Sequence, residues 1–184
     1  MLKKFSTKEL VFIALIGTLL FLMELFIVAA LGVIFGAGVG FLAVAVFWTA
    51  IAIFGGLVVR KFGTFTMMAF IYSVLAIPTT VFGPPGIYKI IPATLVGFLV
   101  DVSVSALRYR KAGYYLGAIV GQVVGLLLFA VAFLLLGFPG QAELFASLWF
   151  LIPLYAVEAL LGCWIGILVN NKLKNKKILR QISY

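Results

Sequence analysis

Long uncharged stretches are the feature that most limits how this chain can fold. Six apolar segments of about twenty residues follow one another, separated by short links that hold glycine, proline or charged residues. A helix of that length crosses the hydrocarbon of a bilayer, and within lipid the backbone must satisfy its own hydrogen bonds. The sequence therefore predicts an all-α integral membrane protein.

The composition supports the same fold class. Hydrophobic residues make up 65% of the chain and charged residues 10%, whereas a soluble domain has about 25% charged residues. We expect one domain over residues 1–184, a compact bundle of six transmembrane helices, with Ser6 or Thr7 capping the first helix and Glu9 in its first turn. The expected spans are Leu10–Leu31, Phe41–Val59, Thr64–Val81, Tyr88–Leu107, Gly113–Leu136 and Leu144–Val169.

The basic residues predict how the bundle is oriented. Thirteen of the fourteen Lys and Arg residues lie in the two terminal segments and in the links after the second and fourth spans. Basic residues at the ends of apolar runs are typical of cytoplasmic anchors, so we expect the net charge of +9 to face the inner leaflet and not a nucleic acid. Both termini are then cytoplasmic. Lys89 is the exception, because it follows the Gly83–Gly86 turn (GPPG) on the outer side.

Small residues recur at helical spacing on three of the expected helices. Such stripes let helix backbones approach closely in lipid. They comprise Gly113, Gly117, Gly121 and Gly125 in the fifth helix, Gly162 and Gly166 in the sixth, and Ala14, Gly17 and Thr18 in the first. Two interpretations stay open for the first helix: its small face packs within the bundle, or it docks another membrane protein.

Ionisable side chains within the spans are candidate functional groups, because burying them in lipid is costly. Glu24 lies in the outer half of the first span, Glu158 near the middle of the sixth, and Lys89 at the start of the fourth. A pocket with Lys89 and Glu24 at its polar ends suits a small solute that carries both charge signs. The structural alternative is a protonated carboxyl that bonds a neighbour, or a lysine that reaches to water.

Aromatic and amide side chains at similar depth can stack on a planar solute and form hydrogen bonds with it. They are Trp48, Tyr72, Tyr88, Gln122, Trp149 and Tyr155. For Tyr88 and Trp149 an interfacial aromatic belt is the alternative. The chain has no histidine, one cysteine and no Walker A loop, so we expect no metal site, no bound cofactor and no enzyme activity.

The layout resembles the substrate-binding S component of energy-coupling factor (ECF) vitamin transporters. The resemblance is carried by six expected spans with internal termini, the small first-helix motif Ala14–Thr18 and the glycine-rich link Gly32–Gly40. The family has alanine at the second small position of that motif, where this chain has Thr18. The resemblance implies capture of a vitamin or cofactor precursor outside a prokaryotic plasma membrane, and delivery inward with a T component and two ATPase subunits.

The family's site lies in the outer half of the bundle, below the first outer link, which acts as a lid. Carried over to this chain, it implies contacts from Ile34, Phe35, Tyr88, Lys89, Trp149 and Tyr155, to which Glu24 and Glu158 are added as candidates. The alternative is a membrane scaffold similar to the rod-shape determinant MreD, which has no solute site. Lys89, Glu24 and the glycine-rich link favour the binding protein.

Overall fold

The computed structural model of the chain describes residues 4–35, 37–80, 84–137 and 141–176, and for residues 28, 29, 31–35, 37–43, 141 and 143 only the backbone. Every regular element in this part of the chain is helical. The elements are α1 (Thr7–Phe35), α2 (Ala37–Val59), α3 (Thr64–Ala76), the short 3₁₀ helix η1 (Ile87–Lys89), α4 (Ile90–Ala106), α5 (Lys111–Leu135) and α6 (Gln141–Leu173).

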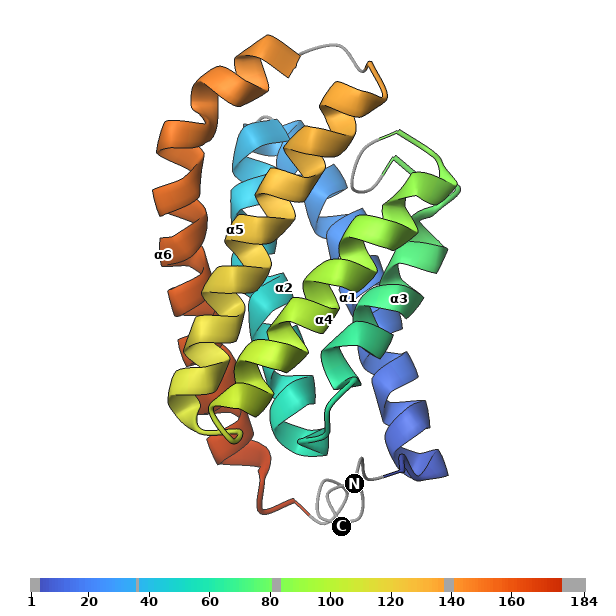
Figure 1. Cartoon of the computed structure of the whole chain (residues 1–184), viewed down its shortest axis with the longest axis vertical. Coiled ribbons are helices and arrows are strands. Elements are labelled where there is room, and N and C mark those ends of the chain that lie inside the picture. The colour runs from blue at the N-terminus through green and yellow to red at the C-terminus, as the bar shows by residue number, and fades with distance from the viewer. Residues whose placement is uncertain (1–3, 36, 81–83, 138–140, 177–184) are drawn as a thin grey trace.

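The six α-helices form a closed ring in which successive helices run in opposite directions (Figure 1). Each helix packs mainly against two others, in the order α1, α2, α6, α5, α4, α3 and back to α1. The start of α1 and the end of α6 lie at one end of the bundle, together with the α2–α3 and α4–α5 links. The basic links thus share one end, which is the arrangement that the predicted orientation requires; the orientation itself stays a prediction.

Two hydrogen bonds confirm that Ser6 caps the first helix. The Ser6 amide donates to Glu9 Oε2 over 2.6 Å, and the Glu9 amide donates to Ser6 Oγ over 3.3 Å. This reciprocal capping box satisfies donors that the first turn leaves without helical partners. The Lys61 ammonium group forms an ion pair with Glu9 over 2.7 Å, which joins the start of α1 to the α2–α3 link.

The glycine stripes pack helices against one another within the bundle. A β-carbon at Gly162 would lie 2.6 Å from the carbonyl oxygen of Val46, so α6 and α2 are in backbone contact there. A β-carbon at Gly17 would lie 3.0 Å from the carbonyl oxygen of Met68, so this part of the predicted docking face is buried against α3. Ala14 and Thr18 beside it are half-buried. Docking of a partner on this face stays a prediction.

Several expected helix boundaries were wrong. The glycine-rich segment Gly32–Gly40 was expected to be a loop, but α1 extends to Phe35 and α2 begins at Ala37. In lipid, backbone amide and carbonyl groups find hydrogen-bond partners only within the protein, and a helix supplies them. This gain offsets the low helix propensity of glycine. The third helix ends at Ala76, five residues early and just before Pro78, which has no amide hydrogen to donate to a helical hydrogen bond.

Four helical segments are long and apolar enough to cross a membrane. They are Thr7–Ile27, Ile87–Ala106, Lys111–Leu135 and Leu144–Leu173. The described apolar parts of α2 and α3, Val44–Val59 and Thr64–Ala76, are shorter. With 13 residues, α3 spans about 20 Å, against about 30 Å of hydrocarbon. The four long apolar helices fit a membrane protein, and α3 is the shortest α-helix in the described part of the chain.

Candidate functional site

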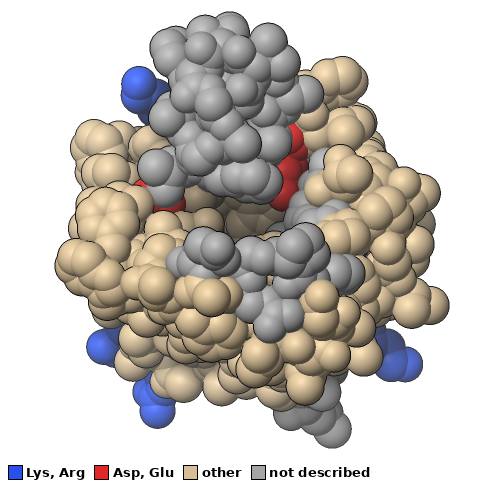
Figure 2. All heavy atoms as spheres, turned by 90° about the horizontal axis from the view of Figure 1, so that it is seen from above, with Lys and Arg blue, Asp and Glu red and all other residues tan. Residues whose placement is uncertain are grey.

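The ring of helices encloses a cavity of about 800 Å³. Sites for small molecules typically have volumes of about 300–1,000 Å³. All six helices contribute to its lining, which is mostly apolar. Seen from the end opposite the basic links, the bundle is hollowed at its centre, acidic atoms are visible at the hollow, and the basic side chains in view lie at the outline (Figure 2).

One wall of the cavity carries a carboxylate held by an aromatic pair. The Tyr72 hydroxyl on α3 donates to Glu24 Oε2 on α1 over 2.5 Å. The Trp48 ring on α2 packs edge-to-face with Tyr72, with ring centroids 5.8 Å apart and an interplanar angle of 83°. The three side chains therefore tie together α1, α2 and α3 at one level and present a carboxylate and aromatic surface to the cavity.

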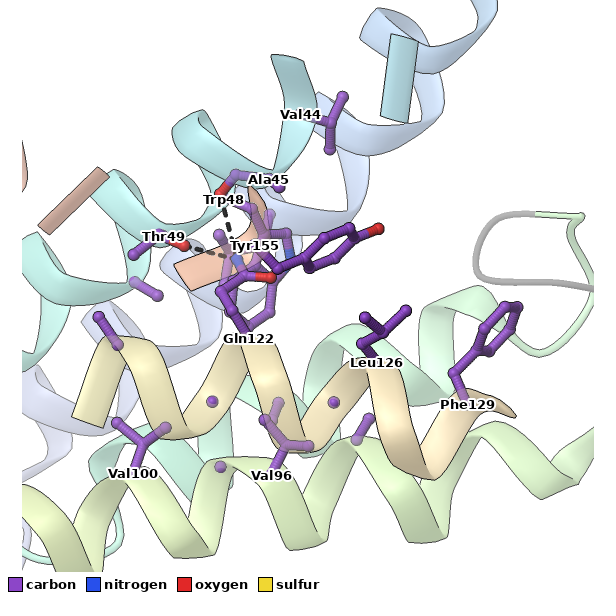
Figure 3. A pocket seen from close by; sticks show the side chains of 18 of the residues that line it. Val44, Ala45, Trp48, Thr49, Val96, Val100, Gln122, Leu126, Phe129 and Tyr155 are labelled. Carbon is purple, nitrogen blue, oxygen red and sulfur yellow. Dashed lines mark hydrogen bonds between the residues drawn. The ribbon is translucent and has the colours of Figure 1, made fainter. Parts of the chain in front are cut away.

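A second part of the wall presents a fixed amide. Gln122 on α5 donates from Nε2 to the Ala45 carbonyl oxygen over 3.2 Å and to Thr49 Oγ1 over 2.6 Å (Figure 3). Because a carbonyl oxygen can only accept, these bonds fix the amide nitrogen toward α2. The amide oxygen of Gln122 is then the atom available to accept a hydrogen bond from a group in the cavity.

Tyr155 on α6 completes this level of the cavity. Its side chain borders the cavity and is drawn with Trp48 and Gln122 in Figure 3. Tyr155 also interacts electrostatically with Glu158 and Glu24. Five of the six helices thus contribute a polar or aromatic side chain to one layer of the bundle, and the sixth, α4, contributes small and apolar ones.

Space for the cavity comes from small residues on two neighbouring helices. These are Ala93 and Gly97 on α4, and Gly117, Gly121 and Gly125 on α5. The sequence predicted the glycines of α5 as a packing stripe, and Gly113 and Gly117 do pack against α4. The stripe also borders the cavity toward its other end, a second role that the spacing of glycines alone does not reveal.

No known protein family, curated protein or solved structure matches this chain. A fold alone does not assign a function, and here the function has to be inferred from the site.

The structure places two of the predicted site residues, Glu24 and Tyr155, on the cavity wall. Trp149 is not part of the wall: its side chain is 80% exposed on the outside of α6. The two positions are six residues apart, so on a helix their directions differ by about 120°. Tyr88 is also absent from the wall, and its hydroxyl donates to the Pro84 carbonyl oxygen over 2.8 Å.

Lys89 and Glu158 are buried outside the cavity wall. Lys89 was expected at the mouth of the bundle, but its side chain is completely buried and donates to two backbone carbonyl groups. Glu158 is 6% exposed, and its Oε2 has no hydrogen-bond partner among the described residues. The side chain of Phe35 lies outside the described part of the chain. A contact of these residues with a solute stays a prediction.

Among the described residues, no three acidic or cysteine side chains come close enough to hold a metal ion. Glu24 is the one charged side chain among the described residues that border the cavity. The Glu24 carboxylate interacts electrostatically with the buried Lys89 ammonium group behind the wall. Apart from the Glu24 carboxylate, the described wall offers aromatic surface and a few fixed hydrogen-bonding groups.

Proposed function

We propose that this chain is a membrane-embedded binding protein for a small solute and acts as the S component of an ECF-type importer. The single observation that carries the proposal is the cavity of about 800 Å³, which lies inside the ring and is bordered by all six helices. A bundle whose helices only pack together fills its interior with side chains. A large cavity that holds a fixed amide and a carboxylate is instead typical of a ligand site.

The wall chemistry supports a planar solute that is largely apolar and neutral. The Trp48 and Tyr155 rings offer stacking surfaces, and the Gln122 amide oxygen accepts a hydrogen bond from a donor on the solute. Glu24 is the one charged side chain among the described wall residues, and it already accepts from the Tyr72 hydroxyl and interacts electrostatically with Lys89, so the proposed solute has no net charge. A heteroaromatic vitamin or its precursor has this combination of ring and polar edge.

We further propose that all six helices cross a prokaryotic plasma membrane with both termini in the cytoplasm. The basic links lie at one end of the bundle, as the positive-inside rule requires. The solute then enters at the hollowed end and is released inward. ATP hydrolysis is assigned to two partner ATPases, joined to this chain through a T component, because this chain has no ATP-binding motif.

Cysteine labelling tests the orientation. Pro85→Cys and Arg108→Cys introduce thiols at two exposed positions at opposite ends of the bundle. In intact cells, an impermeant maleimide should label position 85 at once and position 108 only after permeabilisation. The native Cys163 is completely buried, so the unmodified chain is the blank for this experiment. Labelling of both positions from the same side contradicts the proposed orientation.

Native mass spectrometry of the purified chain tests the binding function. A binding protein should carry a co-purified small molecule or take one up from a panel of vitamins and heteroaromatic precursors. Thermal unfolding should then shift upward, because a ligand at 100 times its Kd adds about 2.7 kcal/mol of stability. The MreD-like scaffold predicts no bound molecule and no ligand-induced shift, and this result would overturn the proposed function.

A further inference from the structure

The short helix α3 has a charged side chain from the adjoining chain segment at each end. At its start, Asp101 on α4 accepts hydrogen bonds from the Thr66 amide over 2.8 Å, the Thr66 hydroxyl over 2.7 Å and the Phe65 amide over 3.3 Å. At its end, Lys89 donates to the carbonyl oxygens of Ala76 over 2.9 Å and Thr79 over 2.7 Å. A negative group thus sits at the positive end of the helix dipole and a positive group at the negative end.

The surroundings of the Lys89 ammonium group are those of a cation site. Carbonyl oxygens from the end of a broken helix, with a carboxylate nearby, are the groups that hold Na⁺ in transporters with discontinuous membrane helices. Here two such carbonyl oxygens accept from Nζ, and Glu24 interacts with it electrostatically. The Lys89 side chain is 0% exposed, so its charge is surrounded by protein groups, these carbonyl oxygens among them.

Further hydrogen bonds hold the described residues of the segment that follows α3. The Thr79 amide and hydroxyl both donate to the Ala76 carbonyl oxygen, and the Gly86 amide donates to the Ile77 carbonyl oxygen over 2.9 Å. Thr80, the residue after the second Lys89 contact, borders the cavity, and so does Glu24. Lys89 therefore bonds to the segment that carries Thr80 and interacts electrostatically with Glu24 on α1, so it acts on two parts of the cavity wall.

We propose that Lys89 is a tethered cation. Its ammonium group occupies a monovalent-cation site made by the end of α3 and the Glu24 carboxylate, and it positions the wall of the cavity without a dissolved ion. This inference goes beyond the proposed function and does not depend on the solute, because it concerns how the wall is held. It predicts that a free cation can replace the lysine once the side chain is cut back.

Thermal unfolding of the purified Lys89→Ala variant, in choline buffer free of Na⁺ and K⁺, tests the proposal. The melting temperature should fall by about 5 °C or more, because the Ala76 and Thr79 carbonyl oxygens lose a charged donor in a buried place. Propylammonium, which replaces the atoms that the substitution removes, should restore most of this loss in a saturable way, and Na⁺ is the second probe. If the variant folds poorly, the same comparison is made on folded yield with propylammonium present throughout.

Two matched variants separate the proposal from a general effect of salt. Lys89→Met keeps the length of the side chain but has no charge and leaves no space, so it should be destabilised and not rescued. Asp101→Ala damages the other end of α3, where a cation has no role, and should not be rescued either. The proposal is overturned if neither cation stabilises Lys89→Ala, if Asp101→Ala gains equally, or if Lys89→Met is as stable as the unmodified chain.

Discussion

The substitution Gly162→Ala should prevent α6 from packing against α2, so that little of the protein folds. A β-carbon there would lie 2.6 Å from the Val46 carbonyl oxygen and 2.7 Å from Thr49 Cβ. Overpacking costs about 1–3 kcal/mol where side chains can yield, and here backbone has to move as well. We expect a loss of about 3 kcal/mol or more, measured as folded yield and as melting temperature in detergent by circular dichroism.

Gly125→Ala is the matched control for this substitution. It places the same methyl group on a helical glycine of α5, where the nearest atom, Val96 Cγ2, is 3.6 Å away in ordinary contact. Because alanine favours the helix by about 0.5–1 kcal/mol over glycine, the control should be as stable as the unmodified chain or slightly more stable. Equal stability of the two variants would mean that α6 and α2 are not in the contact described.

The substitution Gly125→Phe should abolish binding of the solute, while the chain still folds. Gly125 borders the cavity, and the space around its α-carbon is open apart from Val96. A ring at this position occupies the part of the cavity between α4 and α5, so a planar solute no longer fits. We expect affinity to fall by more than about 100-fold, which corresponds to about 2.7 kcal/mol.

Native mass spectrometry and ligand-induced thermal shifts measure this loss, with the Gly125→Ala variant as the control that should keep binding. Folding of Gly125→Phe is checked independently by its melting temperature without ligand. A folded Gly125→Phe variant that carries the same solute as the unmodified chain would place the solute outside this cavity.

The helices and their arrangement at the two ends of the bundle follow from local properties of the sequence. The helices are predicted by the lengths of the apolar runs and by the Ser6–Glu9 capping box. Their arrangement at the two ends is predicted by the basic links Arg60–Lys61 and Arg108–Lys111. The packing of α6 against α2 does not follow from the sequence. The stripe formed by Gly162 and Gly166 predicts a close helix contact but does not specify the partner, which depends on how the whole ring closes.

The sequence predicted which kinds of side chain form the candidate site better than it predicted which of them face the cavity. Trp48, Tyr72 and Gln122 were predicted to lie at similar depth, and all three border the cavity. Whether a side chain on a membrane helix faces inward depends on the rotation of that helix, which a uniformly apolar sequence does not encode. Lys89 was misplaced for a different reason: the early end of α3 at Ala76 created carbonyl acceptors that the expected longer helix would have used internally.

The ring order also determines when the cavity comes into existence during synthesis. Because α6 closes the circle by packing against α2 and α5, a nascent chain that has formed only α1 to α5 has an incomplete chamber. The Thr49 and Gln122 pair would then lie at an open seam facing lipid. The cavity is therefore complete only once α6 has packed between α2 and α5.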